Sequence, residues 1–227
     1  MLVLFDIDGT LLTSLRAGIG AMTSALHELH GVEADFEGIE IHGRLDRLIW
    51  RDLSAKHKLP GTEADHATFK QTYTRHLRDR LGAANTAAAL PGALALVEAV
   101  RATRGVTIGL LTGNYEDTGR LKVQFAGFDP DVFLVNAWGD EGPDRRSLVP
   151  VAHERYHRRN GVRIAPERVV ILGDTPADVD CAKAHGARVL AVASGGFTED
   201  QLRQTEADIV VPNLTDTAAI ARWILAA

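Results

Sequence analysis

Short runs of apolar residues recur along the chain and predict buried β-strands. One run lies at the start of the chain, and the others lie beyond residue 100. A strand with one solvated face alternates apolar and polar residues, whereas a continuous apolar run indicates burial on both faces. The runs are 2–5 (LVLF), 106–111 (VTIGLL), 169–172 (VVIL), 189–192 (VLAV) and 209–211 (IVV), with a weaker candidate at 133–135 (FLV).

Segments with helical spacing of apolar residues separate these strands from residue 92 onward. Strands that alternate with helices are typical of a parallel sheet with helices on both faces. The sequence therefore predicts an α/β protein with a Rossmann-like parallel sheet as its core. The predicted helices are 92–103, 115–126, 146–160, 177–185, 198–204 and 215–225.

The interval from about residue 14 to 88 interrupts this alternation. Apolar residues recur there at helical spacing in three groups without a strand pattern between them, and Thr62 with Asp65 forms a capping-box pattern before the third. We expect a helical cap domain at 14–88, inserted after the first strand, and a core domain made of 1–13 and 89–227. The three groups begin at Leu15, Leu45 and Phe69.

Composition narrows the class of protein further. The 227 residues are 45% hydrophobic and carry a net charge of −5, which suits a globular core and disfavours nucleic acid as a partner. No apolar run reaches the ~18 residues of a membrane span. The single cysteine, Cys181, cannot form an internal disulfide, and Asp6 and Asp8 interrupt any secretory signal at the start. We therefore expect a cytoplasmic protein, as a monomer or a homodimer.

Polar side chains follow three of the predicted strands directly. Asp6 and Asp8 follow the first, Thr112 the second, and Asp174 the run 169–172, with Asp178 four residues later. In an open parallel sheet, ligands bind beyond the carboxyl ends of the strands. Each group alone is compatible with a turn or a helix cap. Their joint placement favours one site at this edge of the sheet.

Phosphoryl transfer through an aspartate is the chemistry that needs such a set. A carboxylate and a phosphate repel each other, and a bound Mg²⁺ with oxygen ligands neutralises both. Attack by one carboxylate gives an aspartyl phosphate, and a second carboxylate can move protons to the leaving group and from water. Gly9 would let the backbone approach the phosphate, and Thr112 with a basic residue would hold its oxygens.

These residues resemble the haloacid dehalogenase superfamily, and in particular its phosphoglycolate phosphatase-like members with a helical cap. The matching segments are DIDGT at 6–10, LTGN at 111–114 and GDTPAD at 173–178. The resemblance implies Asp6 as the nucleophile and Asp8 as the general acid and base. It also implies Mg²⁺ on Asp6, the Asp8 backbone carbonyl and Asp174, with Asp178 in support. Thr112, Gly113 and Asn114 would then bind the phosphate.

The usual lysine of the family's third motif is missing. The segment EGPDRRSLVP at 141–150 has no lysine, and its register against the following helix favours Arg145 over Arg146 as the replacement. Arginine supplies the same charge and can bind an anion in bidentate fashion. We expect Lys122 to be a surface residue because it lies in a different segment.

The segment IHGRLDRLIW at 41–50 resembles the loop by which related caps reach over the site. Gly43 and Arg44 are therefore predicted to contact the organic part of a small phosphorylated metabolite. An arginine there would favour substrates with a second anionic group.

The predicted function is a Mg²⁺-dependent phosphatase for small phosphate monoesters. A sugar phosphomutase like β-phosphoglucomutase uses the same aspartates and stays open as an alternative, with His42, Lys56 and His57 as cap acid or base candidates. A catalytically silent binding protein would have lost one of the three acids Asp6, Asp8 and Asp174, and none is lost.

Overall fold

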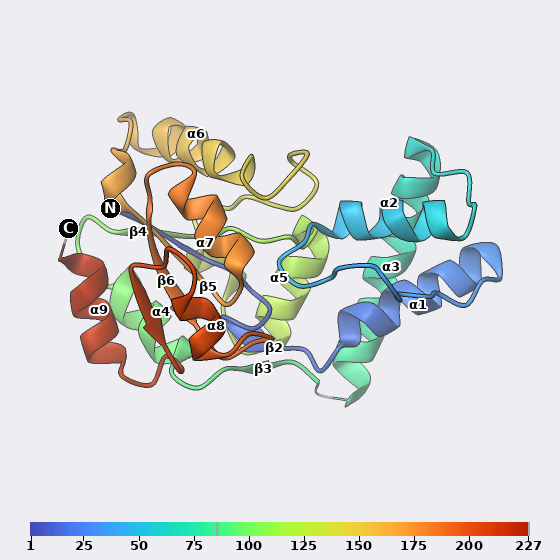
Figure 1. Cartoon of the computed structure of the whole chain (residues 1–227), viewed down its shortest axis with the longest axis horizontal. Helices are drawn as coiled ribbons and strands as arrows, with labels where there is room; N and C mark the ends of the chain where they lie inside the picture. Colours follow the sequence, from blue (N-terminus) through green and yellow to red (C-terminus); the bar gives the residue numbers. More distant parts are fainter. Residues whose placement is uncertain (85, 227) are drawn as a thin grey trace.

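A parallel sheet forms the centre of the larger part of the molecule (Figure 1). The computed structural model describes residues 1–84 and 86–226. Within them the sheet order is β4-β1-β5-β6-β7, and every neighbouring pair is parallel. The predicted α/β class is thus confirmed. The strands are β1 (Leu2–Phe5), β4 (Thr107–Leu110), β5 (Val169–Gly173), β6 (Arg188–Val192) and β7 (Ile209–Val211).

Both faces of the sheet are buried, as the continuous apolar runs predict. On β1, Val3 and Phe5 belong to one hydrophobic cluster, whereas Leu2 and Leu4 belong to the other. The first cluster includes side chains of α4 (Ala93–Arg101), α5 (Glu116–Phe125) and α9 (Thr217–Leu225). The second includes side chains of α6 (Leu148–Asn160), α7 (Pro176–Lys183) and α8 (Glu199–Arg203).

Three helices of the interval 14–88 lie to one side of the sheet (Figure 1). They are α1 (Ala17–His30), α2 (Asp46–Lys56) and α3 (Glu63–Ala84). The Thr62 and Asp65 side chains each accept the other's backbone N–H, so the predicted capping box is present. The two-residue strands β2 (Leu12–Thr13) and β3 (Ala88–Ala89) pair antiparallel where the chain leaves and re-enters the core. The division into a cap and a core at these points stays a prediction, and Asn85 and Ala227 lie outside the described residues.

The weaker strand candidate at 133–135 is wrong. The segment does run along the outer edge of β4, since Leu134 N–H donates to the Ile108 carbonyl at 2.8 Å. A side chain supplies the next acceptor along β4, because Leu110 N–H donates to Asn136 Oδ1 at 3.0 Å and not to a backbone carbonyl. A side chain that replaces the backbone acceptor interrupts the ladder. Only an isolated bridge between Leu111 and Ala137 follows.

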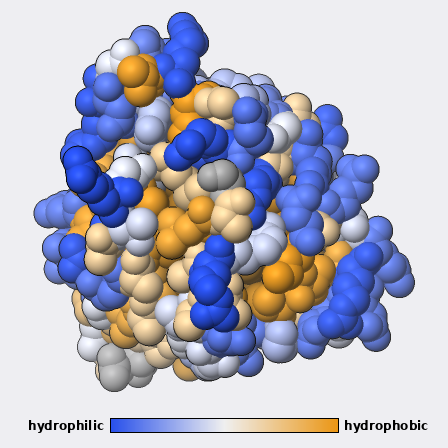
Figure 2. Space-filling view, turned by 90° about the vertical axis from the view of Figure 1, so that its left-hand side faces the viewer, coloured by the Kyte–Doolittle hydropathy of each residue, from blue (hydrophilic) through white to orange (hydrophobic). Residues whose placement is uncertain are grey.

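The end of the core remote from the cap carries a mixed surface. Figure 2 shows hydrophilic side chains there, with smaller hydrophobic areas between them. Apolar groups in this proportion are usual on the surface of folded proteins. Among the described residues, no helix combines the length and the apolar character needed to cross a membrane.

Candidate active site

Three buried carboxylates meet at the carboxyl end of the sheet, where β1 and β5 are neighbours. Asp6 directly follows β1, and its backbone N–H donates to the Leu172 carbonyl of β5 at 2.9 Å. Asp174 directly follows β5, and Asp178 lies in the first turn of α7. One carboxylate oxygen of each acid lies within 4.8 Å of the others. The sheet therefore brings together acids that are distant in the sequence.

Two glycines make room for Asp174. A Cβ atom at Gly9 would lie 2.3 Å from Asp174 Oδ2, and one at Gly195 would lie 1.7 Å from it. Gly9 also has a φ of 78°, in the left-handed region that L-residues avoid. The Ser194 hydroxyl donates to the Gly9 carbonyl at 2.8 Å and joins the two loops. Gly9 is thus explained by its contact with Asp174, and its approach to phosphate stays a prediction.

Arg145 lies among these acids, just before α6. Its Nη2 lies 2.9 Å from Asp6 Oδ1, and its Nε and Nη2 donate to Asp178 Oδ1 at 3.0 and 2.5 Å. Arg146 instead pairs with Asp180 at the surface. Arg145, which the sequence favours over Arg146, is therefore the arginine that lies in the acid cluster. The role of Arg145 toward a phosphate stays a prediction.

Replacing Arg145 with methionine would leave Asp6 and Asp178 buried without their cation. In metal-free buffer we expect the free energy of unfolding to fall by about 3 kcal/mol, as for one partner removed from a buried ion pair. Urea denaturation measures this difference. Arg146→Met is the matched control and should cost less than ~1 kcal/mol, because the pair with Asp180 is exposed. Equal losses in both variants would contradict the placement of Arg145.

The cluster contains three acids and one cation, Arg145, so a further cation would be favourable there. Burial raises the pKa of Asp6 to about 6 against the opposing charge of Arg145, and Asp178 and Asp8 add to the rise. Burial, followed by the charges of Asp6 and Asp178, raises the pKa of Asp174 to about 8. Arg145 pairs with Asp6 and Asp178, whereas no ion pair of the described residues includes Asp174. Buried oxygen donors with excess negative charge suit a hard divalent metal ion.

Asp178 has a supporting position in the cluster. Its Oδ1 accepts from Arg145, and its Oδ2 accepts from the backbone N–H and the hydroxyl of Thr175 at 3.1 and 2.6 Å. These bonds also complete the capping box that begins α7. Because both oxygens are already in use, Asp178 orients Arg145 and is less suited than Asp6 or Asp174 to bind a metal directly.

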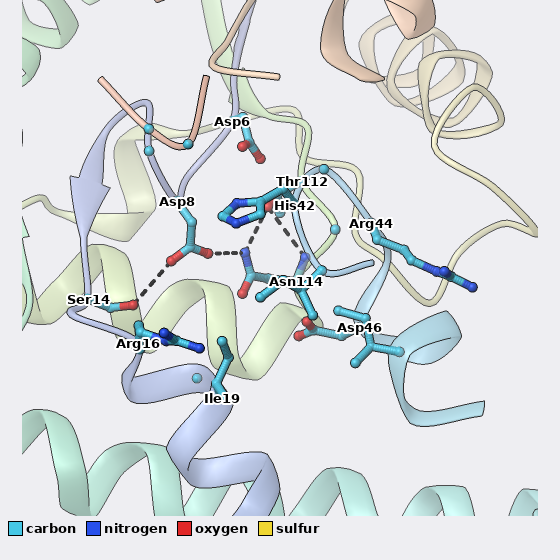
Figure 3. A pocket seen from close by; sticks show the side chains of 18 of the residues that line it. Asp6, Asp8, Ser14, Arg16, Ile19, His42, Arg44, Asp46, Thr112 and Asn114 are labelled. Atoms are coloured by element: carbon cyan, nitrogen blue, oxygen red, sulfur yellow. Dashed lines mark hydrogen bonds between the residues drawn. The ribbon is translucent and has the colours of Figure 1, made fainter. Parts of the chain in front are cut away.

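Asp8 faces a different set of partners, shown in part by the dashed lines of Figure 3. Its Oδ2 accepts from Asn114 Nδ2 at 2.9 Å and from Lys122 Nζ at 2.6 Å, and its Oδ1 accepts from the Ser14 hydroxyl at 3.3 Å. Burial raises the pKa of Asp8, but the charge of Lys122 and these hydrogen bonds outweigh it and lower the pKa overall. The carboxylate of Asp8 is thus held apart from the metal candidates.

The expectation that Lys122 is a surface residue is wrong. Lys122 is 5% exposed, and its ammonium bonds to Asp8 and to Asn114 Oδ1, the latter at 2.7 Å. The helical spacing in the sequence could have indicated this burial. Lys122 lies on the same buried face of α5 as Thr118, Gly119 and Val123. A lysine on an otherwise small or apolar helical face is costly to bury without an acidic partner.

The loop after β4 carries Thr112, Gly113 and Asn114. The Thr112 hydroxyl is fully buried and accepts from Asn114 Nδ2 at 2.9 Å. Asn114 Nδ2 thus bonds to both Thr112 and Asp8, which ties the ends of β4 and β1 together. All three residues line the same cavity as Asp6 and Asp8. Their binding of a phosphate stays a prediction.

The cap touches this loop directly. Asp46, the first residue of α2, donates its backbone N–H to the Gly113 carbonyl at 2.7 Å, and its Oδ2 accepts the Tyr115 N–H at 3.3 Å. Burial raises the pKa of Asp46 to about 7 despite the nearby charge of Lys122. Gly43 supports the same contact, because its carbonyl accepts from Arg145 Nη1 at 3.3 Å. The segment 43–46 of the predicted cap is therefore in direct contact with the core in this structure.

A side chain at Gly113 would oppose this contact. Its Cβ atom would lie 2.1 Å from the Arg44 carbonyl oxygen, so the segment 43–46 would have to move away. For Gly113→Ala we expect kcat/KM to fall on the order of 10²-fold, because the cap residues lose their alignment with the core. Steady-state kinetics on any accepted phosphate ester measures the effect.

Gly82→Ala is the control for the Gly113 variant. Its Cβ atom would lie 3.9 Å from the nearest Phe125 side-chain atom, an ordinary contact, and Gly82 is inside α3. It should leave kcat/KM unchanged and keep or raise the thermal midpoint. Activity of Gly113→Ala equal to that of this control would show that the contact at Gly113 does not matter.

A cavity of about 400 Å³ lies between the cap and the acid cluster. Its cap side is mixed: Ile19, Met22, Phe36, Ile41 and Ile49 are apolar, whereas Ser14, Arg16, His42, Arg44, Asp46 and Tyr73 are polar. The core residues that the sequence predicts for the site also line the cavity, with the exception of Asp178.

Gly43 and Arg44 both line the cavity, and their contact with a substrate stays a prediction. Arg44 has a partner in the cap segment itself. Its guanidinium pairs with Asp52 of α2 and is directed away from Asp6 and Asp8 in Figure 3. Arg16 also lines the cavity, and no ion pair or side-chain hydrogen bond of the described residues involves it. Leu15 and Arg16 both have positive φ values, 46° and 64°. Such strain in non-glycine residues concentrates at functional sites.

Comparison with known proteins agrees with this geometry. The model of the family described as haloacid dehalogenase-like hydrolase matches residues 3–183. The chain therefore belongs to the haloacid dehalogenase-like hydrolases, and the predicted resemblance is confirmed.

Several curated proteins match almost the whole chain. A phosphoglycolate phosphatase of Rhodospirillum rubrum is 27% identical, over 98% of this chain and 90% of its own. Hexitol phosphatase A of Escherichia coli is 30% identical, over 93% and 90%. The tyrosine-protein kinase PtkA of Mycobacterium tuberculosis is 28% identical, over 92% and 67%. The family and the two phosphatases support the predicted enzyme class, a phosphatase.

Solved structures share the fold. The crystal structure of CbbY from Rhodobacter sphaeroides in complex with phosphate superposes with a TM-score of 0.68 at 21% identity, and covers 95% of each chain. A β-phosphoglucomutase-like protein of Thermotoga maritima superposes with a TM-score of 0.66 at 18% identity, over 99% of each chain. At these identities the likeness concerns the fold and not the reaction.

Proposed function

We propose that this protein hydrolyses small phosphate monoesters in two steps, through a phosphorylated Asp6 and with Mg²⁺. The observation that carries the proposal is the meeting of Asp6, Asp174 and Asp178 with Arg145 at one sheet edge, beside a separately held Asp8. In the metal-free protein the pKa of Asp6 is raised and that of Asp8 is lowered. A divalent cation on Asp6 would lower the pKa of Asp6 and keep it ionised as the nucleophile.

In the first step, an Asp6 oxygen attacks the phosphorus atom of the ester. The bond from phosphorus to the ester oxygen breaks. Asp8, in the molecules in which it carries a proton against its lowered pKa, gives that proton to the leaving oxygen. Arg145 and Thr112 hold the other phosphate oxygens by charge and hydrogen bonding. The products of this step are an alcohol and an aspartyl phosphate.

In the second step, water attacks the phosphorus atom of the aspartyl phosphate. Asp8, now a carboxylate, takes the proton of that water, and the bond between phosphorus and Asp6 breaks. Inorganic phosphate leaves, and both acids return to their starting states. A closed cap limits the access of bulk water until the alcohol has left.

Asp6, Asp174 and the Asp8 backbone carbonyl are the groups that would hold the metal ion. Bound there, Mg²⁺ would neutralise the repulsion between the Asp6 carboxylate and the phosphate. The buried, oxygen-only donor set and the raised pKa of Asp174 support this choice. Asp178 keeps Arg145 in place beside these ligands.

The cavity limits the size of the substrate. About 400 Å³ between the predicted cap and the core leaves room for a small metabolite and little room for a side chain of a folded partner. The apolar part of the cap lining suits a carbon chain, and Arg16 offers a cation for a second anionic group. The relatives named phosphoglycolate phosphatase and hexitol phosphatase support small organic phosphates as the class. A cytoplasmic location and the oligomeric state stay predictions.

The positions of the cap candidates favour hydrolysis over a mutase reaction. Lys56 pairs with Asp35, and His57 accepts the Asp35 N–H, and neither residue lines the cavity. Only His42 of the three faces the site. Other polar side chains of the predicted cap also line the cavity, namely Ser14, Arg16, Arg44, Asp46 and Tyr73, so the preference for hydrolysis rests on the positions of Lys56 and His57.

A panel of phosphorylated metabolites with Mg²⁺ tests the proposal. We expect release of inorganic phosphate from esters of roughly two to six carbons, a size that fits a cavity of this class. Folded phosphoproteins should be poorer substrates than the best small ester. Higher activity on folded phosphoproteins than on every small ester would overturn the proposed substrate class. Isomerisation of a sugar phosphate without phosphate release would favour the mutase.

A further inference from the structure

Lys122 is the one buried lysine of the described residues that contacts an acid of the site. It belongs to α5, outside the segments that match the family's motifs. Its Nζ lies 2.6 Å from Asp8 Oδ2 and 2.7 Å from Asn114 Oδ1. Asn114 Nδ2 donates to the same Asp8 oxygen at 2.9 Å. Two donors from different segments, Lys122 and Asn114, therefore meet at one oxygen of Asp8.

The surroundings of Lys122 fix it in this position. Its ammonium lies beneath α1, where a Cβ atom at Gly18 would be 3.5 Å from Nζ and 3.3 Å from the hydroxyl of Tyr73 of α3. A larger residue at Gly18 would thus press on the lysine. Because α5 is itself packed against the sheet, Lys122 is held by regular structure rather than by a mobile loop.

The two oxygens of Asp8 differ sharply as a result. Oδ2 accepts the two short bonds from Lys122 and Asn114. Within the described part of the chain, Oδ1 has only the longer bond from the Ser14 hydroxyl at 3.3 Å. An oxygen with two donors at short distance has little capacity left for a third partner. Oδ1 is therefore the oxygen that can turn its lone pair toward the substrate.

We propose that Lys122 is a positioning residue, which holds Asp8 by Oδ2 so that Oδ1 exchanges the proton with the leaving oxygen and then with water. This inference rests on the proposed function. In the first step the proton on Oδ1 moves to the ester oxygen as its bond to phosphorus breaks. In the second step Oδ1 takes a proton from the attacking water. Lys122 lines the cavity, but its ammonium is occupied by Asp8 and Asn114, so it acts through Asp8 and not on the substrate.

Lys122→Met keeps most of the volume and removes both bonds of the ammonium. We expect single-turnover release of an alkyl alcohol to slow by ~10²-fold, the range of a misaligned general acid. An aryl phosphate, whose leaving group needs little protonation, should release its phenol with less than ~10-fold slowing. KM for both esters should stay within about threefold, since no substrate contact is lost.

A double variant separates positioning from other roles. If Lys122 acts through Asp8, then Asp8→Asn with Lys122→Met should be no slower on the alkyl ester than Asp8→Asn alone. Additive losses would overturn the proposal. Equal slowing of alkyl and aryl esters, or a large rise in KM, would also overturn it and would indicate a structural or phosphate-binding role.

Lys183→Met is the matched control. Lys183 of α7 also pairs with a carboxylate, Asp208 at 2.5 Å, and does not line the cavity. This variant should leave both rates unchanged. If Lys122→Met does not fold, Lys122→Gln keeps a buried donor and is judged by the same ratio of alkyl to aryl rates. A wild type that hydrolyses neither ester would overturn the proposed function itself, which is a different outcome from the failures above.

Discussion

Asp6→Asn is expected to remove turnover almost completely, by at least ~10³-fold, because an amide cannot act as the nucleophile. The thermal midpoint should change little. Asparagine keeps the shape of the side chain and relieves repulsion from Asp174 and Asp178, while Arg145 keeps its bonds to Asp178. Steady-state kinetics and thermal unfolding of the same preparation measure both effects.

Asp180→Asn is the control for this substitution. Asp180 is also paired with an arginine, but at the surface, and should tolerate the change without loss of rate. A preparation of Asp6→Asn that keeps a tenth of the wild-type activity would show that another group attacks the phosphorus atom.

Removal of divalent metal is expected to have an effect of similar size. Without it, no bound cation offsets the repulsion between the Asp6 carboxylate and a phosphate. Exhaustive chelation should abolish activity, and Mg²⁺ should restore it. Ca²⁺ should inhibit, because it prefers more ligands at longer distances and would misplace the nucleophile.

Metal binding also has a readout that does not depend on activity. At roughly a hundredfold excess over Kd, Mg²⁺ should raise the thermal midpoint of the wild type by about 5 to 10 °C. Asp174→Asn removes one of the proposed ligands and should show a much smaller rise. Full activity after chelation, or equal rises in both proteins, would contradict a metal site at these acids.

The sheet and the acid cluster were predictable because both depend on short, local patterns. A strand buried on both faces has to be apolar throughout, as at 2–5 and 169–172. Parallel strands then bring the residues that follow them to one edge, which predicts the meeting of Asp6 with Asp174. The segment 133–135 has the same composition but is not a strand, because the Asn136 side chain takes the place of a backbone acceptor.

Contacts between side chains of the cap and the core were not predictable in this way. Arg44 lies in the expected loop and lines the cavity, but its guanidinium pairs with Asp52 of α2, which the sequence did not indicate. Lys122 was missed because a lysine is usually exposed, and its partner Asp8 is distant in the sequence. The spacing of the buried residues of α5 could have indicated that Lys122 is buried, but it does not indicate that Asp8 is its partner.

The most direct test of the account is the detection of a phosphoryl group on Asp6. In Asp8→Asn, an aryl phosphate should still pass the first step, while attack by water on the aspartyl phosphate is slowed. Acid quenching followed by peptide mass spectrometry should then show one added phosphoryl group on the peptide that contains Asp6. Turnover of the aryl ester with no phosphorylated enzyme, or with the phosphoryl group on another residue, would contradict the account.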